Sequence, residues 1–242
     1  MAKNVAKVSR RRQPARVQPD QERPASTHRA APVAIRLPEP KTMNQACMIA
    51  AMVADNMKLI FADGPAGVGK TYLAAATAAY MYDQRLVRRI VLTRPAVEAG
   101  EELGFMPGEL HEKYAPWMAP FRIELEKVLG SGRVELMVKN KDLVGLPLAH
   151  MRGHTFDNDF VILDEAQNTT PAQMKMFLTR IGENCKIVVD GDVEQKDIPG
   201  RSGLEDALSR LVGLDEVALI SFCELDVVRS GLVQKILARY RI

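Results

Sequence analysis

Residues 58–71 read Lys58-Leu59-Ile60-Phe61-Ala62-Asp63-Gly64-Pro65-Ala66-Gly67-Val68-Gly69-Lys70-Thr71. The apolar run at residues 58–62 predicts a buried strand, and residues 72–82 favour a helix. The eight residues from Gly64 to Thr71 fit G-x-x-x-x-G-K-[ST], the phosphate-binding loop that joins a strand to a helix. A glycine-rich turn that matches by chance is the alternative, and the strand before it and the helix after it argue against that alternative.

Each part of this loop has a predicted role in binding ATP. The glycines let the backbone curl so that its amides point at the phosphates, and the helix that follows adds its positive end. Lys70 is expected to neutralise the β- and γ-phosphates, and the Thr71 hydroxyl to bind Mg²⁺. The predicted nucleotide-binding residues of the loop are Gly64, Pro65, Ala66, Gly67, Val68, Gly69, Lys70 and Thr71.

A pair of acidic residues follows a later apolar run. Residues 160–163 lead into Asp164-Glu165-Ala166-Gln167. This position predicts that Asp164 lies beside the Mg²⁺ and that Glu165 orients and deprotonates the attacking water. A solvated Asp-Glu pair is the alternative, but its place at the end of a strand favours catalysis. Glu165 also favours hydrolysis over phosphoryl transfer to a small molecule.

A third polar segment follows the apolar run at residues 186–189. It reads Asp190-Gly191-Asp192-Val193-Glu194-Gln195. We expect Asp192 and Gln195 to reach the γ-phosphate and to report its loss. A surface turn is the alternative, because Asp-Gly is a common turn pair.

The chain as a whole alternates apolar runs with helix-like segments. Five short runs, at residues 58–62, 89–93, 160–163, 186–189 and 216–220, lack the polar alternation of a half-exposed sheet. Strands of this kind are buried on both faces, as in a parallel sheet covered by helices. The predicted fold class is therefore α/β.

Composition excludes several classes of protein. The 242 residues are 47% hydrophobic and 26% charged, as in ordinary globular proteins. No apolar run approaches the roughly 18 residues of a membrane span, and no secretory signal is apparent, so we expect no membrane partner and a cytoplasmic location. The three cysteines are far apart and predict neither a disulfide framework nor a zinc site.

Residues 1–41 differ from the rest. They hold six of the fourteen prolines and ten basic against three acidic residues, a charge of +7, whereas the remaining residues carry −4. Because this segment has no apolar pattern, it cannot bury enough surface to offset the conformational entropy that ordering would cost. We therefore expect a disordered basic arm before a folded domain at residues 42–242. One possible role of this arm is that of a transit peptide. We favour contact with the phosphate backbones of nucleic acid, or improved solubility.

Further stretches resemble the PhoH family of ATPases, whose core is similar to the first motor domain of superfamily 1 helicases. The resemblance covers about residues 45–240 and implies a RecA-like P-loop fold. Beyond the phosphate loop and the Asp164 segment, it rests on residues 93–101 (Thr-Arg-Pro-Ala-Val-Glu-Ala-Gly-Glu), 103–108 (Leu-Gly-Phe-Met-Pro-Gly), 151–153 (Met-Arg-Gly), 202–204 (Ser-Gly-Leu) and 226–229 (Asp-Val-Val-Arg).

The resemblance implies two further roles. Gln45 is expected to read the adenine edge, with a polar residue on an exposed helix face as the alternative. Arg94 is expected near a strand of nucleic acid, with an internal salt bridge as the alternative.

About 200 folded residues leave no room for the second motor domain of helicases, so we expect a homo-oligomer, with a hexameric ring as one arrangement. A neighbouring subunit would then supply the arginine that contacts the γ-phosphate. Arg229 is the leading candidate, followed by Arg152 and Arg201, for which a weak surface ion pair is the alternative.

Aromatic residues between 95 and 130 suggest a second contact with nucleic acid. Phe105, Tyr114, Trp117 and Phe121 lie near Lys113 and Arg122, and single strands are held by aromatic stacking beside positive charge. Trp117, Phe121 and Leu125 are also at helical spacing, so a core position is the favoured alternative.

Two functions stay open from the sequence. The first is an ATPase coupled to RNA or single-stranded DNA as an oligomeric motor or remodeller. The second is a nucleotide-dependent switch that acts on a protein partner without nucleic acid.

Overall fold

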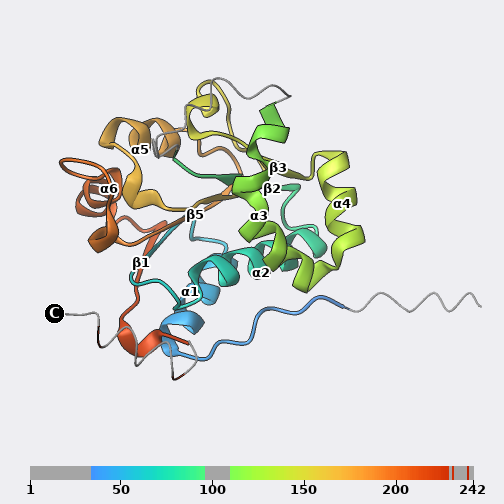
Figure 1. Ribbon diagram of the computed structural model, residues 1–242, viewed down its shortest axis with the longest axis horizontal. Coiled ribbons are helices and arrows are strands. Elements are labelled where there is room, and N and C mark those ends of the chain that lie inside the picture. The colour runs from blue at the N-terminus through green and yellow to red at the C-terminus, as the bar shows by residue number, and fades with distance from the viewer. Residues whose placement is uncertain (1–33, 96–109, 229–230, 232–238, 240–242) are drawn as a thin grey trace, which may run out of the picture. The chain divides into compact units, whose positions relative to one another are not determined.

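The computed structural model describes residues 34–95 and 110–228 together with residues 231 and 239, and within the second range the side chains from residue 118 onward. Strands and helices alternate along most of these residues, except that α4 follows α3 directly (Figure 1). The helices are α1 (Met43–Val53), α2 (Lys70–Asp83), α3 (Leu110–Leu129), α4 (Ser131–Asn140), α5 (Pro171–Leu178) and α6 (Gly203–Leu211). The strands are β1 (Leu59–Asp63), β2 (Arg89–Thr93), β3 (Leu143–Gly145), β4 (Asp159–Leu163), β5 (Lys186–Gly191) and β6 (Val217–Ser221).

The strands form one six-stranded sheet in the order β3-β2-β4-β5-β1-β6, and every pairing is parallel. The predicted α/β fold with a parallel sheet flanked by helices is confirmed, and it is consistent with a RecA-like P-loop fold. The strand order places β5, which comes late in the sequence, between β1 and β4. The ends of the phosphate-loop strand and of the Asp164 strand therefore lie on either side of the end of β5.

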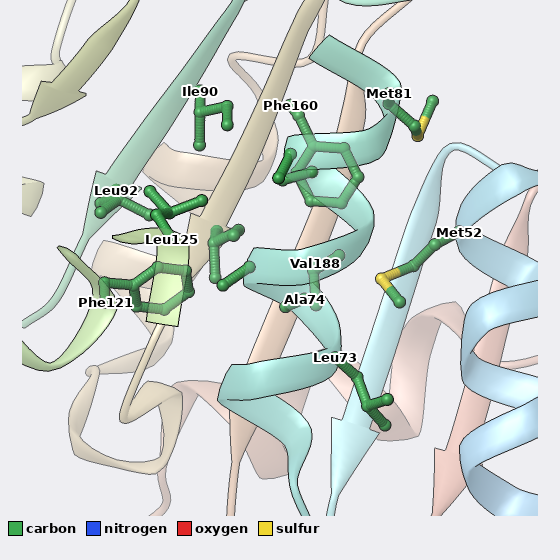
Figure 2. Close-up of a cluster of buried hydrophobic side chains, with 14 of the residues drawn as sticks. Met52, Leu73, Ala74, Met81, Ile90, Leu92, Phe121, Leu125, Phe160 and Val188 are labelled. Carbon is green, nitrogen blue, oxygen red and sulfur yellow. The ribbon is translucent and has the colours of Figure 1, made fainter. Parts of the chain in front are cut away.

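Helices cover both faces of the sheet because successive side chains of each strand point to opposite faces. Ile60 belongs to a buried cluster on one face that includes side chains of α1, α2, α3 and α4, whereas its neighbour Phe61 belongs to the cluster on the other face, which includes side chains of α5 and α6. Figure 2 shows part of the first cluster, in which Phe160 and Val188 of the sheet lie against the α2 helix. Both faces of the central strands are thus buried, as the unbroken apolar runs predict.

The helices α5 and α6 begin at side-chain caps. In α5 the Thr170 hydroxyl accepts a hydrogen bond from the backbone of Gln173, whose side chain returns to the Thr170 N–H. Ser202 and Glu205 form the same reciprocal pair at the start of α6. Such caps satisfy backbone donors that have no partner inside the helix. They fix where α5 and α6 begin.

Several boundaries differ from those expected. The strand β3 was not predicted, because three residues are too few to show a pattern. The run at residues 186–189 extends to Gly191, so Asp190 belongs to the strand rather than to the loop after it. Of the predicted arm, residues 34–41 are described and contain no helix or strand. The domain boundary at Thr42 stays a prediction.

Phe121 takes the core position that its helical spacing favours, rather than a stacking position for nucleic acid. Its ring is 4% exposed and packs in the core with Leu125, which is fully buried. Arg122 pairs with Glu126 on the same helix, at 2.7 Å. The side chains of Phe105, Lys113, Tyr114 and Trp117 lie outside the described residues. None of the helices that the structure describes is long and apolar enough to cross a bilayer.

Candidate functional site

The loop between β1 and α2 curls because three of its glycines adopt positive φ angles: Gly64 (140°), Gly67 (93°) and Gly69 (90°). Gly64 also touches the end of β6 so closely that a Cβ atom there would lie 2.5 Å from the Phe222 carbonyl oxygen. The Gly64 N–H donates to the Gly191 carbonyl oxygen at 3.1 Å. The loop is therefore fixed to the carboxyl ends of β5 and β6, and it delivers the amino terminus of α2 to the same edge.

Lys70 and Thr71 begin α2 and point toward β5. The Lys70 ammonium donates to the carbonyl oxygens of Gly64, at 2.6 Å, and Pro65, at 3.2 Å. It also lies 3.7 Å from a carboxylate oxygen of Asp190. The Thr71 hydroxyl donates to the other Asp190 oxygen at 3.1 Å. Both predicted loop side chains thus share one acidic neighbour.

Asp190 is a site residue that was not predicted from the sequence. Its carboxylate is 3% exposed, and burial, together with the nearby charge of Asp164, raises its pKa to about 8. Lys70 and the hydrogen bond from Thr71 act in the opposite direction. An acid directly before Gly191-Asp192, at the end of an apolar run, resembles the placement of Asp164. This shared position, directly after an apolar run, was the sequence signal that could have identified Asp190.

Asp164 and Glu165 follow β4 as expected, and Arg94 follows the neighbouring strand β2. An Arg94 nitrogen donates to Asp164 Oδ2 at 2.7 Å and to Glu165 Oε1 at 3.4 Å. Burial raises the pKa of Asp164, while the Arg94 charge lowers it. Arg94 thus forms an internal salt bridge, which was the alternative to a position near nucleic acid.

Glu165 has an unusual backbone. Its φ angle is 54°, in the left-handed region, which costs a non-glycine residue roughly 1–2 kcal/mol. Residues held in this region cluster at functional sites. Glu165 Oε2 accepts a hydrogen bond from the Gln167 amide at 2.6 Å, and Gln167 Oε1 accepts from the Asp192 N–H at 3.1 Å. Gln167, which is buried, thereby joins the two segments that follow β4 and β5.

These groups surround one cavity of about 280 Å³. Its lining consists of Ala66, Gly67, Gly69, Lys70, Thr71, Tyr72, Asp164, Glu165, Gln167, Asp190, Gly191, Asp192 and Gln195. Among these, Lys70 is the one cation and four residues are acidic. A wider groove of about 730 Å³ lies between α5 and α6, but its walls are mainly apolar and no catalytic set converges on it. The smaller cavity is the candidate site because charge and hydrogen-bonding groups meet there.

A sequence profile for the family described as PhoH-like protein matches residues 38–241. The chain belongs to the PhoH family. It is 49% identical over 202 residues to a PhoH-like protein of Bacillus subtilis strain 168, which covers 83% of this chain and 63% of the relative. It is 46% identical over 203 residues to a PhoH-like protein of Mycobacterium tuberculosis strain H37Rv and 44% identical over 203 residues to Protein PhoH of Escherichia coli K12. These alignments cover 83% and 81% of this chain, and each covers 57% of the relative.

Gln45 is one of the other predicted residues of this PhoH-family chain. The Gln45 residue is only 5% exposed, which excludes the alternative of a polar residue on an exposed helix face. Its amide donates to the Val68 carbonyl oxygen at 2.9 Å and accepts from the Lys41 N–H at 2.7 Å, which ties α1 to the phosphate loop. Contact of Gln45 with adenine stays a prediction.

Asp192 and Gln195 both line the cavity, from opposite ends of the short helix η4 (Val193–Gln195). The Asp192 carboxylate accepts from the Glu194 N–H at 3.0 Å, so it caps that helix, while Gln195 is exposed. Arg201 pairs with Asp206 at 3.2 Å, which matches the alternative of a surface ion pair. Arg152 is exposed, and Arg229 lies outside the described residues.

Proposed function

We propose that this protein binds Mg·ATP and hydrolyses it to ADP and phosphate in the cavity between α2 and the ends of β4 and β5. The observation that supports this most strongly is the meeting of four groups on one cavity: the Lys70 ammonium, the Thr71 hydroxyl, and the carboxylates of Asp164 and Glu165. These groups come from segments more than 90 residues apart. Membership of the PhoH family adds support.

The triphosphate would lie in the loop. The backbone amides of the curled glycines and the amino terminus of the 14-residue helix α2 favour an anion there. The Lys70 ammonium, which bonds to loop carbonyl oxygens in the structure, lies within reach of the same space. Lys70 would exchange these neutral acceptors for the β- and γ-phosphates, which form stronger charge-assisted hydrogen bonds.

The donor set suits Mg²⁺, which prefers oxygen ligands. The Thr71 hydroxyl and the Asp164 carboxylate line the cavity beside the buried acid Asp190. Burial raises the pKa of both acids, because unneutralised negative charge is unfavourable there. When bound, Mg²⁺ would neutralise the phosphate oxygens and hold them in position. Thr71 and Asp164 would hold it, directly or through water.

Glu165 would act as the general base. As the oxygen of water bonds to the γ-phosphorus, its proton passes to the Glu165 carboxylate and the bond to the bridging oxygen breaks, leaving ADP and phosphate. Asp192 and Gln195 would respond to the departing phosphate, and the Gln167 bridge provides a physical link from Asp192 to Glu165.

Coupling to RNA or single-stranded DNA is the favoured use of this hydrolysis, because residues 1–41 carry a charge of +7. Lys70 is the one cation among the described lining residues. An arginine from a second copy of the chain would supply further positive charge to stabilise the γ-phosphate in the transition state. Arg229 of a homo-oligomer is the proposed donor. A switch that acts on a protein partner is the second candidate function.

The test is steady-state phosphate release with and without single-stranded RNA, alongside binding of a fluorescent ATP analogue. Lys70→Ala should abolish binding and turnover, whereas Lys175→Ala, an exposed lysine on α5, should leave both unchanged. Stimulation by RNA that falls steeply with salt would support the motor. ATP hydrolysis at a rate that RNA and DNA do not change would favour the protein switch. A wild-type protein that releases no phosphate would refute the proposed hydrolysis.

A further inference from the structure

Arg94 lies across the two acids that the proposed reaction needs. One of its guanidinium nitrogens is 2.7 Å from Asp164 Oδ2 and 3.4 Å from Glu165 Oε1. Its side chain is 28% exposed, and those of Asp164 and Glu165 are 17% and 43% exposed. Arg94 is therefore a partly buried cation beside the predicted metal ligand and the predicted base, although it does not line the phosphate cavity.

The contacts of Glu165 restrict its role as a base. Both of its carboxylate oxygens accept hydrogen bonds, Oε1 from Arg94 and Oε2 from the Gln167 amide. A general base must present a lone pair to the water that it deprotonates. Each oxygen of Glu165 already shares one of its two lone pairs with a donor that competes with water for the carboxylate, and the longer and weaker of the two bonds is the one from Arg94.

The contact with Asp164 has a second consequence. A divalent cation held by Asp164 would share that carboxylate with the positive charge of Arg94, and like charges at such separations repel strongly where water is partly excluded. Arg94 therefore opposes the binding of Mg²⁺ at the residue that would hold it.

Two buried polar atoms at and beside Arg94 make this pairing less stable than its ion pairs alone would. Arg94 Nε and Thr93 Oγ1 are both buried, and neither has a hydrogen-bond partner among the described residues. Both residues border a small cavity of about 20 Å³, together with Met118 and Phe121. Buried donors without partners destabilise the arrangement that contains them. Rotation of Arg94 away from the acids would expose its Nε to a partner.

We propose that Arg94 is a positioning residue that holds Asp164 and Glu165 in a restrained pairing, weakens divalent-cation binding, and must leave Glu165 before water is deprotonated. The proposal rests on the proposed function and adds a control point to the same site. Arg94 lies at the end of β2, so whatever displaces this end of the strand would release both acids together.

The experiment compares wild type with Arg94→Ala and Arg94→Lys. Free Mn²⁺ is followed by electron paramagnetic resonance in the presence of ADP, and phosphate release is measured at saturating ATP. We expect Arg94→Ala to bind Mn²⁺ roughly tenfold more tightly and to hydrolyse ATP faster, while affinity for ADP without divalent cation changes little. The lysine variant keeps the charge without the planar fork and should fall between the two.

Arg88→Ala is the matched control. Arg88 precedes the other end of β2 and its side chain is 63% exposed, so its removal should change neither Mn²⁺ binding nor turnover. The double variant Arg94→Ala/Glu165→Gln should lose the faster hydrolysis if Glu165 is the group that Arg94 restrains.

The outcomes separate the two proposals. If wild type hydrolyses ATP, and Arg94→Ala binds Mn²⁺ no more tightly than wild type does, the role of Arg94 is overturned and the proposed hydrolysis stands. A wild type that binds ADP and Mn²⁺ but forms no phosphate would overturn the proposed hydrolysis, whereas tighter Mn²⁺ binding by Arg94→Ala would still support the electrostatic part of the inference.

Discussion

Gly64 provides a sharp test of the loop geometry. Its φ angle is 140°, which residues with a Cβ atom rarely adopt, and an added Cβ would lie 2.5 Å from the Phe222 carbonyl oxygen and 2.8 Å from the Phe222 Cβ. Both obstacles are at the end of β6, and the carbonyl is backbone that cannot rotate away. The change Gly64→Ala must therefore displace the phosphate loop, the end of β6, or both.

The expected cost has two parts. The backbone conformation costs about 1–3 kcal/mol, and the steric overlap adds about 1–3 kcal/mol, as for other overpacked positions. Gly130→Ala is the matched control, because Gly130 has a φ angle of 80° and nothing within 4 Å of an added Cβ. It should bear the conformational cost alone. We therefore expect Gly64→Ala to unfold with a free energy about 1–3 kcal/mol below that of Gly130→Ala.

Urea unfolding followed by circular dichroism measures both variants, and binding of a fluorescent ATP analogue shows whether the loop still forms. Gly64→Ala should lose affinity for the nucleotide, whereas Gly130→Ala, between α3 and α4, should keep it. Equal stability of the two variants, with full nucleotide affinity in both, would show that Gly64 does not approach Phe222 as the structure indicates.

Three further predictions concern ionisable groups. Arg89 makes two hydrogen bonds, of 2.9 and 2.8 Å, to the fully buried Asp159. Arg89→Ala should therefore destabilise the protein by about 3 kcal/mol in urea unfolding. Arg88 lies 3.5 Å from the same carboxylate and is largely exposed, so Arg88→Ala should cost less than about 1 kcal/mol. Burial raises the pKa of Asp190 to about 8, so the folded state retains a proton that the unfolded state releases, and the free energy of unfolding should fall as pH rises from about 4 to about 8. Asp190→Asn should flatten this fall, and an unchanged pH profile would contradict the assignment. Burial also raises the pKa of the Cys185 thiol to about 12, so iodoacetamide should modify the two exposed cysteines of the native protein and leave Cys185 unmodified by mass spectrometry.

The central part of the fold could be predicted because its signals are local. The phosphate loop lies between its strand and its helix in one unbroken stretch, so Gly64 and Lys70 could be placed from the motif. The acid pair at Asp164 follows an apolar run directly. In parallel α/β sheets such strand ends meet at one edge, and the structure brings Asp164 and Lys70 to the same cavity.

The features that were missed depend on pairing in space. Asp190 was taken as a loop residue because the apolar run stops at Val189, yet β5 continues for two more residues beside β1. Arg94 and Asp164 are 70 residues apart and meet only because β2 and β4 are neighbours. The strand β3 has three residues, and no period can be read from so few.

The aromatic segment shows why a pattern can favour one function without excluding another. Phe121 and Leu125 are at helical spacing, and this pattern is shared by a core stripe and by a row of stacking residues. Only packing distinguishes them. The α2 helix lies against α3 in the structure, which buries both side chains and explains why the core alternative holds.

Single-turnover hydrolysis tests whether Glu165 deprotonates water in a site organised by Lys70. Excess protein is mixed with limiting radiolabelled ATP and Mg²⁺, and phosphate formation is followed for wild type and Glu165→Gln, with nucleotide binding measured on the same samples. We expect Glu165→Gln to retain the nucleotide as tightly as wild type and to form phosphate at least about 100-fold more slowly. Phosphate formation by Glu165→Gln at the wild-type rate would contradict that role of Glu165.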